Sequence, residues 1–145
     1  QQKAQITSEV KAVSDSIIAE WAGLDAEAAM RHYAADVSLI FQGDSAVSGH
    51  QAYRQSWVDF NKTADSIQVT RIHEEYRVLA PDLAIALWIG RSRSFLKSGD
   101  TLDIDLQTYS EVYRKTEGHW KMIWQHNSGG PWVTRKAAAT HRPRR

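Results

Sequence analysis

Two acidic side chains are the first residues of this chain whose type and spacing could do chemistry. Asp103 and Asp105 stand two residues apart in a β-rich run, so in a regular strand they share one face. Two carboxylates held this close raise the pKa of one of them, and such a pair can act as general acid and base. An exposed acidic strand edge explains the same spacing, and both interpretations stay open.

The last β-rich run carries a second candidate group. His126 and Ser128 alternate along it, which puts an imidazole and a hydroxyl on one side of a strand. There they can contact a ligand or bond to each other and to buried backbone. The six histidines show no i, i+4 or close strand-alternate pair, and the chain has no cysteine, so the sequence indicates no metal site.

Motifs that bind cofactors or carry nucleophiles are missing from the sequence. There is no Gly-x-Ser-x-Gly elbow, no His-Glu-x-x-His, no phosphate-binding Gly-rich loop and no dinucleotide fingerprint. We therefore expect no cofactor.

Aromatic side chains offer a different kind of site. Trp57, Trp88 and Trp124 are spread over three segments, and such large, rigid, amphipathic rings can line a ligand pocket. Packing in an ordinary core is the alternative role for them.

Helical signals fill the first part of the chain. Apolar residues recur every three or four positions from Ile6 to Leu24, which predicts a long amphipathic helix. Asp25 stands where an N-cap belongs and predicts a second helix over Ala26 to Tyr33. After a strand-like run from Asp36 to Phe41, Ser48 can cap a third helix, from Gly49 to about Asn61. That helix places Tyr53, Trp57 and Phe60 on one side.

From Ser66 onward the apolar period changes to two, which is typical of strands. Hairpin-length turns containing Pro or Gly separate four β-rich runs: Ser66–Leu79, Leu83–Leu96, Thr101–Arg114 and His119–Ser128. Helices followed by an antiparallel meander predict an α+β fold and not alternating α/β units.

The strands predict a sheet in which neither face is simply solvated. Leu83, Ile85, Leu87 and Ile89 alternate with Ala84, Ala86, Trp88 and Gly90, so one face is aliphatic and the other mixed. In the next run Leu102, Ile104 and Leu106 alternate with Asp103, Asp105, Gln107, Tyr109 and Glu111. We expect helices around a pocket on the mixed face and a homodimer across the aliphatic face. The alternative is that helices cover the aliphatic face and the mixed face is wet.

Length and charge set the remaining limits. The 145 residues fit one domain, and no apolar run reaches the length of about 18 residues that a membrane span needs.

Five of the 18 basic residues follow Thr134, so residues 1–134 carry a net negative charge before a basic tail at 135–145. Such a tail could touch nucleic acid or an anionic surface, but a solvated terminus is the more ordinary role, and a nucleic-acid partner is not expected. The start at Gln1 is compatible with a removed leader, so secreted, periplasmic and cytoplasmic locations stay open.

Taken together, the order of elements resembles the nuclear transport factor 2-like superfamily over nearly all of residues 6 to 132. The residues that carry the resemblance are Tyr33-Ala34-Ala35-Asp36, Ser48-Gly49-His50 and the closing Gly118-His119-Trp120 with His126-Asn127-Ser128-Gly129. The closing motif is similar to the SnoaL-like group and to the association domain of calcium/calmodulin-dependent protein kinase II. The resemblance implies a single cone-like domain over 1–134, with a curved antiparallel sheet wrapped around the long N-terminal helix, an internal pocket and a dimer through the convex face.

The resemblance also implies where a ligand would lie. Pocket arginines of the association domain correspond to about Gly90, Glu111 and Asn127, and its pocket histidine corresponds to Tyr53, so the basic lining is absent here. A neutral or cationic small molecule is then easier to accommodate than a carboxylate. The expected ligand-pocket residues are Tyr33, Tyr53, Trp57, Trp88, Asp105, Tyr109, Glu111, His126 and Asn127.

Two other functions stay open. Ketosteroid isomerase-like relatives use an aspartate as base at the end of the first strand, where this chain has Phe41. Glu111 or Asp105, beside the phenols of Tyr109 and Tyr53, could replace that base in a metal-free isomerase, cyclase or hydratase acting on a polyketide-like or steroid-like substrate. The last alternative is an assembly module whose cavity is filled by its own aromatic side chains.

Overall fold

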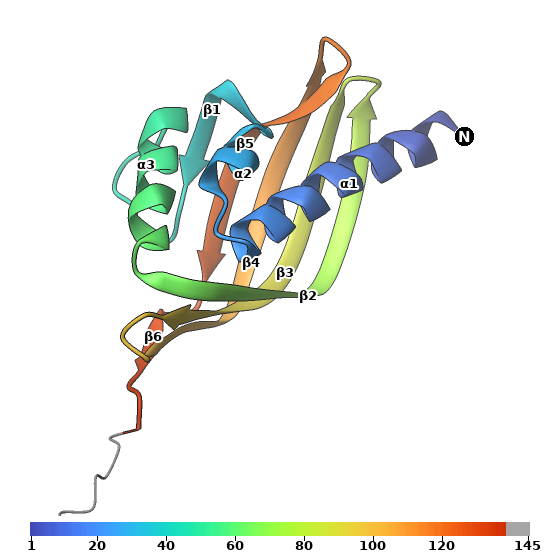
Figure 1. The fold of residues 1–145 in the computed structure, drawn as a ribbon. Helices are drawn as coiled ribbons and strands as arrows, with labels where there is room; N and C mark the ends of the chain where they lie inside the picture. The colour runs from blue at the N-terminus through green and yellow to red at the C-terminus, as the bar shows by residue number, and fades with distance from the viewer. Residues whose placement is uncertain (139–145) are drawn as a thin grey trace, which may run out of the picture.

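Three helices lie on one side of a strongly curved sheet (Figure 1). The structure is a computed structural model, and it describes residues 1–138. The helices are α1 (Gln2–Ala22), α2 (Ala26–Met30) and α3 (His50–Asn61). The strands are β1 (Tyr33–Ile40), β2 (Ala64–Ala80), β3 (Leu83–Leu96), β4 (Thr101–Thr116), β5 (His119–Gly129) and β6 (Val133–Arg135). The predicted α+β class and the long N-terminal helix are confirmed.

Helix α1 packs on the concave face of the sheet through one stripe of side chains. Ile6, Val10, Ile17 and Trp21 are buried, at the helical spacing that the sequence predicted. Ser14 is also buried on this stripe, which places a hydroxyl deep in the core.

Helix α2 is shorter than predicted. The Asp25 cap is confirmed, because its side chain accepts a hydrogen bond from the Ala28 amide at 2.9 Å. The helix ends at Met30, however, because the His32 carbonyl accepts a hydrogen bond from the Met122 amide at 2.8 Å. The chain is therefore already paired with β5 at this point, and Tyr33 begins β1 instead of ending α2.

The predicted cap of α3 is wrong. Gly49 occupies the N-cap position, and the helix has no side-chain cap there. Ser48 instead exchanges two backbone hydrogen bonds of 2.9 Å with Leu39, so it extends the pairing of β1.

The sheet has the order β1-β5-β4-β3-β2. All of these neighbours are antiparallel except β1 and β5, which run parallel. Strand β6 pairs with Thr101–Asp103 of β4 and so continues along the same edge of β4 that β5 occupies from Gln107 onward.

A bulge in β4 changes the faces that simple alternation predicted. The register passes from Ser92 opposite Ile104 to Gly90 opposite Gln107, so β4 has one extra residue there. Asp105 and Leu106 are exposed at this bulge, whereas Asp103 and Gln107 are buried. The predicted alternation, which put Asp103 and Asp105 on the face of Gln107, Tyr109 and Glu111, is therefore wrong: both leave the concave face, and only Asp103 is buried.

The helices cover one face of β3 and leave the other partly open to solvent. Ala84, Ala86 and Trp88 are each 1% exposed beneath the helices. Leu83, Ile85, Leu87 and Ile89 lie on the opposite, convex face and are only half-buried. The helices thus cover the mixed face, and the alternative in which they cover the aliphatic face is wrong.

The first residue of the basic tail, Arg135, is part of the sheet. The buried Asp103 carboxylate accepts two hydrogen bonds of 2.8 Å from Arg93 and one of 2.9 Å from Arg135 of β6. The two hydrogen bonds from Arg93, followed by the one from Arg135, lower the pKa of Asp103 to about 2. Lys136 pairs with Asp100 at 3.0 Å. The other basic residues of the tail, Arg142, Arg144 and Arg145, lie outside the described residues.

We predict that Gly129→Ala destabilises the fold at the point where β5 leads to β6. A methyl group on Gly129 would lie 2.5 Å from the Leu106 carbonyl oxygen and 2.8 Å from Gln107 Cα, both backbone atoms. The backbone must shift to remove this overlap. We therefore expect the free energy of unfolding, measured by urea denaturation, to fall by about 1–3 kcal/mol. Gly130→Ala is the matched control, because its methyl group would meet only the Leu106 oxygen at 3.7 Å. Equal stability of the two variants would contradict the prediction.

Candidate functional site

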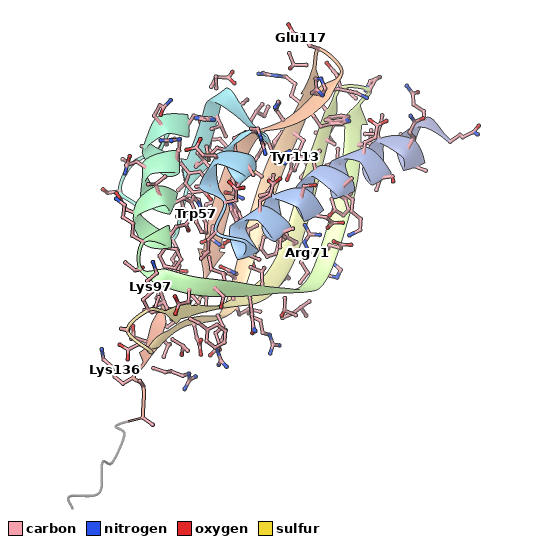
Figure 2. All side chains as sticks on the ribbon, in the orientation of Figure 1. Trp57, Arg71, Lys97, Tyr113, Glu117 and Lys136 are labelled. Atoms are coloured by element: carbon pink, nitrogen blue, oxygen red, sulfur yellow. The ribbon has the colours of Figure 1, made fainter. Side chains whose placement is uncertain are left out.

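A cavity of about 430 Å³ opens between α3, the C-terminal end of α1 and the concave face of the sheet. Figure 2 shows Trp57 on α3 at this position, between the helix and the sheet. Its aromatic lining comes from every layer of the fold: Trp21, Phe41, Tyr53, Trp57, Phe60, Trp88, Tyr109 and Trp132. The rings are ordered by stacking: Trp88 lies on Tyr109 at 4.0 Å between centroids, and Trp21 lies on Trp57 at 5.3 Å.

The polar side chains of the cavity are mostly uncharged. Gln107 accepts a hydrogen bond of 3.0 Å from the Tyr109 hydroxyl, which fixes both groups. Asn127 lines the same wall and is 7% exposed, yet its Nδ2 has no hydrogen-bond partner among residues 1–138. A buried amide in this state favours a ligand that supplies the missing hydrogen bond.

Glu111 lies beneath the cavity and does not line it. Its carboxylate accepts hydrogen bonds from Trp88 Nε1 at 2.9 Å, Gln125 Nε2 at 3.0 Å and the Tyr113 hydroxyl at 2.7 Å. The Ser14 hydroxyl lies 3.5 Å away, and Arg71 donates to that hydroxyl at 2.6 Å. Since Trp88 lines the cavity and bonds to Glu111 through its indole nitrogen, the carboxylate has a structural role behind the ring.

Burial governs the ionisation of these groups. Desolvation raises the pKa of Glu111 above its ordinary value of 4.5, and the hydrogen bonds from Tyr113, Trp88 and Gln125 oppose that rise. Desolvation also raises the pKa of the Tyr53 and Tyr109 phenols, so both stay protonated at neutral pH. In residues 1–138 no cluster of three His, Asp or Glu side chains could hold a metal ion.

The structure brings five of the predicted pocket residues together around the cavity. They are Tyr53, Trp57, Trp88, Tyr109 and Asn127. Tyr33 is buried against Tyr53 at 5.5 Å between ring centroids but does not reach the cavity. Glu111 is on the predicted face of the sheet, but it is buried behind Trp88 and does not line the cavity.

Two predicted pocket residues lie outside the cavity. Asp105 is exposed because the β4 bulge turns it out of the concave face. His126 is exposed on the convex face, because it alternates with the cavity residue Asn127 along β5. Neither side chain lines the cavity.

Other lining residues were not predicted as site residues from the sequence. Trp21 carried only the signal of a buried helix face, and Trp132 follows the last long strand. Ser92 and Ser94 continue the alternation of Trp88 and Gly90 along β3, which could have identified them. Phe41 lines the cavity and stacks on Tyr53 at 5.2 Å between ring centroids.

Comparison with known families now assigns this architecture. The family model of the SnoaL-like domain matches residues 10–132, which include most of α1, the other two helices, all long strands and every residue that lines the cavity. The chain belongs to the SnoaL-like domain family. No curated protein sequence matches it.

Solved structures show the same fold for this SnoaL-like domain. A candidate scytalone dehydratase from Novosphingobium aromaticivorans has a TM-score of 0.82 at 9% identity, covering 94% of this chain and 91% of that one. A nuclear transport factor 2-like superfamily protein from Salmonella enterica has a TM-score of 0.77 at 14% identity, covering 95% and 97%. A candidate calcium/calmodulin-dependent protein kinase II association domain from Xanthomonas campestris has 0.73 at 24%, covering 86% and 88%. At these identities the similarity shows the nuclear transport factor 2-like fold alone.

We predict that Glu111→Gln flattens the pH dependence of stability. Because the pKa of Glu111 is raised in the folded state, its protonated form stabilises the fold fully below about pH 4.5, and this contribution is lost as the pH rises through the folded pKa. Glutamine cannot ionise, so the variant should lose less stability between pH 4.5 and 8 in urea denaturation. Asp105→Asn removes an exposed carboxylate and should keep the original slope. An unchanged slope in Glu111→Gln would show that Glu111 does not titrate this way.

Proposed function

We propose that this SnoaL-like domain binds a small, neutral organic molecule with a flat apolar body in its aromatic cavity. The observation that carries the proposal is the cavity itself, open at about 430 Å³ and walled by stacked indole and phenol rings. That volume falls in the range of drug-sized ligand sites, and aromatic walls bind flat apolar surfaces well. The unpartnered Asn127 amide supports a ligand with one polar group placed against β5.

The charge of the lining favours a neutral ligand. Among the described lining residues, Asp44, in the exposed loop after β1, is the one with a carboxyl side chain, and none is a Lys, Arg or His. An anionic ligand would enter this low-dielectric space without a cation to pair with, and that costs free energy.

The two alternative functions have less support. Acid/base catalysis needs a group of suitable pKa facing the substrate, but Glu111 lies behind Trp88 and both phenols of the lining have raised pKa values. A pure assembly module would fill its cavity with its own side chains, whereas Tyr53, Trp57 and Trp88 leave this one open.

We also propose a homodimer through the convex face of the sheet. Ile85 lies opposite Val112, and Val112 lies opposite Trp124, so one apolar row crosses three strands. Leu87 and Ile89 extend the patch along β3, and all of these side chains are half-buried or exposed. A second copy would remove this apolar area from water.

Filling the cavity should block ligand binding. Ser94 lines the cavity from β3 and is 4% exposed, so Ser94→Phe would place a ring in the open space. The neutral fluorophore N-phenyl-1-naphthylamine should bind the wild-type protein with increased fluorescence, and the variant should bind it at least about tenfold more weakly.

The control for this experiment is Ser8→Phe, which adds the same ring on the exposed side of α1. It should bind the fluorophore as the wild type does. Equal binding by Ser94→Phe would mean that the cavity is not the site. Circular dichroism of both variants would establish that each is folded.

Charge on the convex face should dissociate the dimer. Leu87 lies in the centre of the face, between Glu75 of β2 and Ser110 of β4. In the proposed dimer, Leu87→Lys would bring two ammonium groups into an apolar interface, so the dissociation constant should rise by about 100-fold or more. Light scattering after size exclusion, at tens of micromolar protein, measures the mass. Val47→Lys, in an exposed loop, should stay dimeric, and a monomeric wild type would contradict the proposal.

A further inference from the structure

A second cleft lies at the other end of α1, away from the aromatic cavity. It has a volume of about 520 Å³ and is bordered by the N-terminal half of α1, the segment after α2 and the β4–β5 hairpin. Figure 2 marks Glu117 at the tip of this hairpin, far from Trp57. Glu9 lines the cleft and Trp21 lines the cavity, and these positions are about 18 Å apart along the helix axis. The two sites are therefore separate.

The cleft is rich in positive charge. Its lining contains Arg31, Lys115 and Lys121, with the imidazoles of His32 and His119 beside them. Glu9 is the one acidic residue of the lining. Such an excess of cations in a concave site attracts anions, because the low-dielectric walls focus the field.

The acidic side chains at the cleft are already occupied. The Glu9 carboxylate accepts hydrogen bonds of 2.8 Å from both Lys115 and Trp120, and these bonds lower the pKa of Glu9 to about 2. It therefore stays ionised and neutralises Lys115. Glu20, which is outside the lining, lies 3.0 Å from His32.

Arg31 and Lys121 remain without a carboxylate partner in residues 1–138. The Lys121 ammonium donates a hydrogen bond to the backbone carbonyl of Arg31, which holds the two cationic residues against the same wall. A neutral carbonyl satisfies the donor but does not cancel the charge. Arg31 and Lys121 both border the cleft, so an anion bound there would be attracted by two cations that no carboxylate neutralises.

We propose that this cleft binds a small molecule through an oxyanion, a phosphate or a carboxylate, held by Arg31 and Lys121. The guanidinium group offers a planar pair of donors that matches either oxyanion, and the ammonium group adds a point charge. Ala12 and Val13 of α1 provide an apolar wall for the rest of the ligand. The neutral cavity and the cationic cleft thus select ligands of different chemistry.

Titrations of the full chain with inorganic phosphate and with acetate test the proposal, at constant ionic strength set by sodium chloride. Saturable changes in amide chemical shift are expected for Arg31, His32, Gly118 and Lys121, and not for Trp57 or Asn127. Saturation by phosphate alone would assign a phosphate-bearing ligand, and saturation by acetate alone would assign a carboxylate.

Arg31→Gln and Lys121→Gln should each weaken binding of the saturating anion by about tenfold, since each removes one charge-assisted hydrogen bond. Arg91→Gln is the matched control, because it removes an exposed arginine that does not line the cleft. Absence of saturation with both anions would overturn the proposal. An equal loss of binding in Arg91→Gln would also overturn it, because only the net charge would then matter.

Discussion

The burial of one carboxylate holds the centre of this structure together. Glu111 has no access to water, so its oxygens must be satisfied by the protein, and the donors come from α1, β3, β4 and β5. Trp88 is one of these donors, and its bond to Glu111 fixes the plane of the indole ring. Tyr109 stacks on that ring, so the position of the cavity floor depends on an ionisable group that the cavity never contacts.

Local irregularities then decide what reaches each face of the sheet. The β4 bulge turns Asp105 outward and leaves Asp103 buried on the convex side, where two arginines pair with it. The same bulge brings Ile104 to the cavity beside Gln107. Because Arg135 is one of the partners of Asp103, the shape of β4 also fixes β6 next to the cavity mouth, which is lined by Trp132.

The sequence was sufficient for the order of the helices and the long strands, and for five of the nine predicted pocket residues. Strand alternation found Trp88, Tyr109 and Asn127 because each lies in a regular part of its strand. It failed at Asp105, where the bulge contains neither Gly nor Pro to mark it in the sequence. It also placed Glu111 at the cavity, because alternation tells which face a residue occupies and not how deep it lies.

The position of β5 between β1 and β4 has a consequence for the order of folding. Tyr33 pairs with Met122, so β1 has no neighbour in the sheet until the chain has been made almost to its end. Pairing over such a sequence separation is slow, because the entropy cost of closing a long loop must be met before any strand contact can stabilise it. The β2–β3–β4 meander, whose partners are adjacent along the chain, provides the surface on which β5 and then β1 assemble. The ligand cavity, which needs Phe41, Asn127 and Trp132 together, is therefore among the last features of the molecule to form.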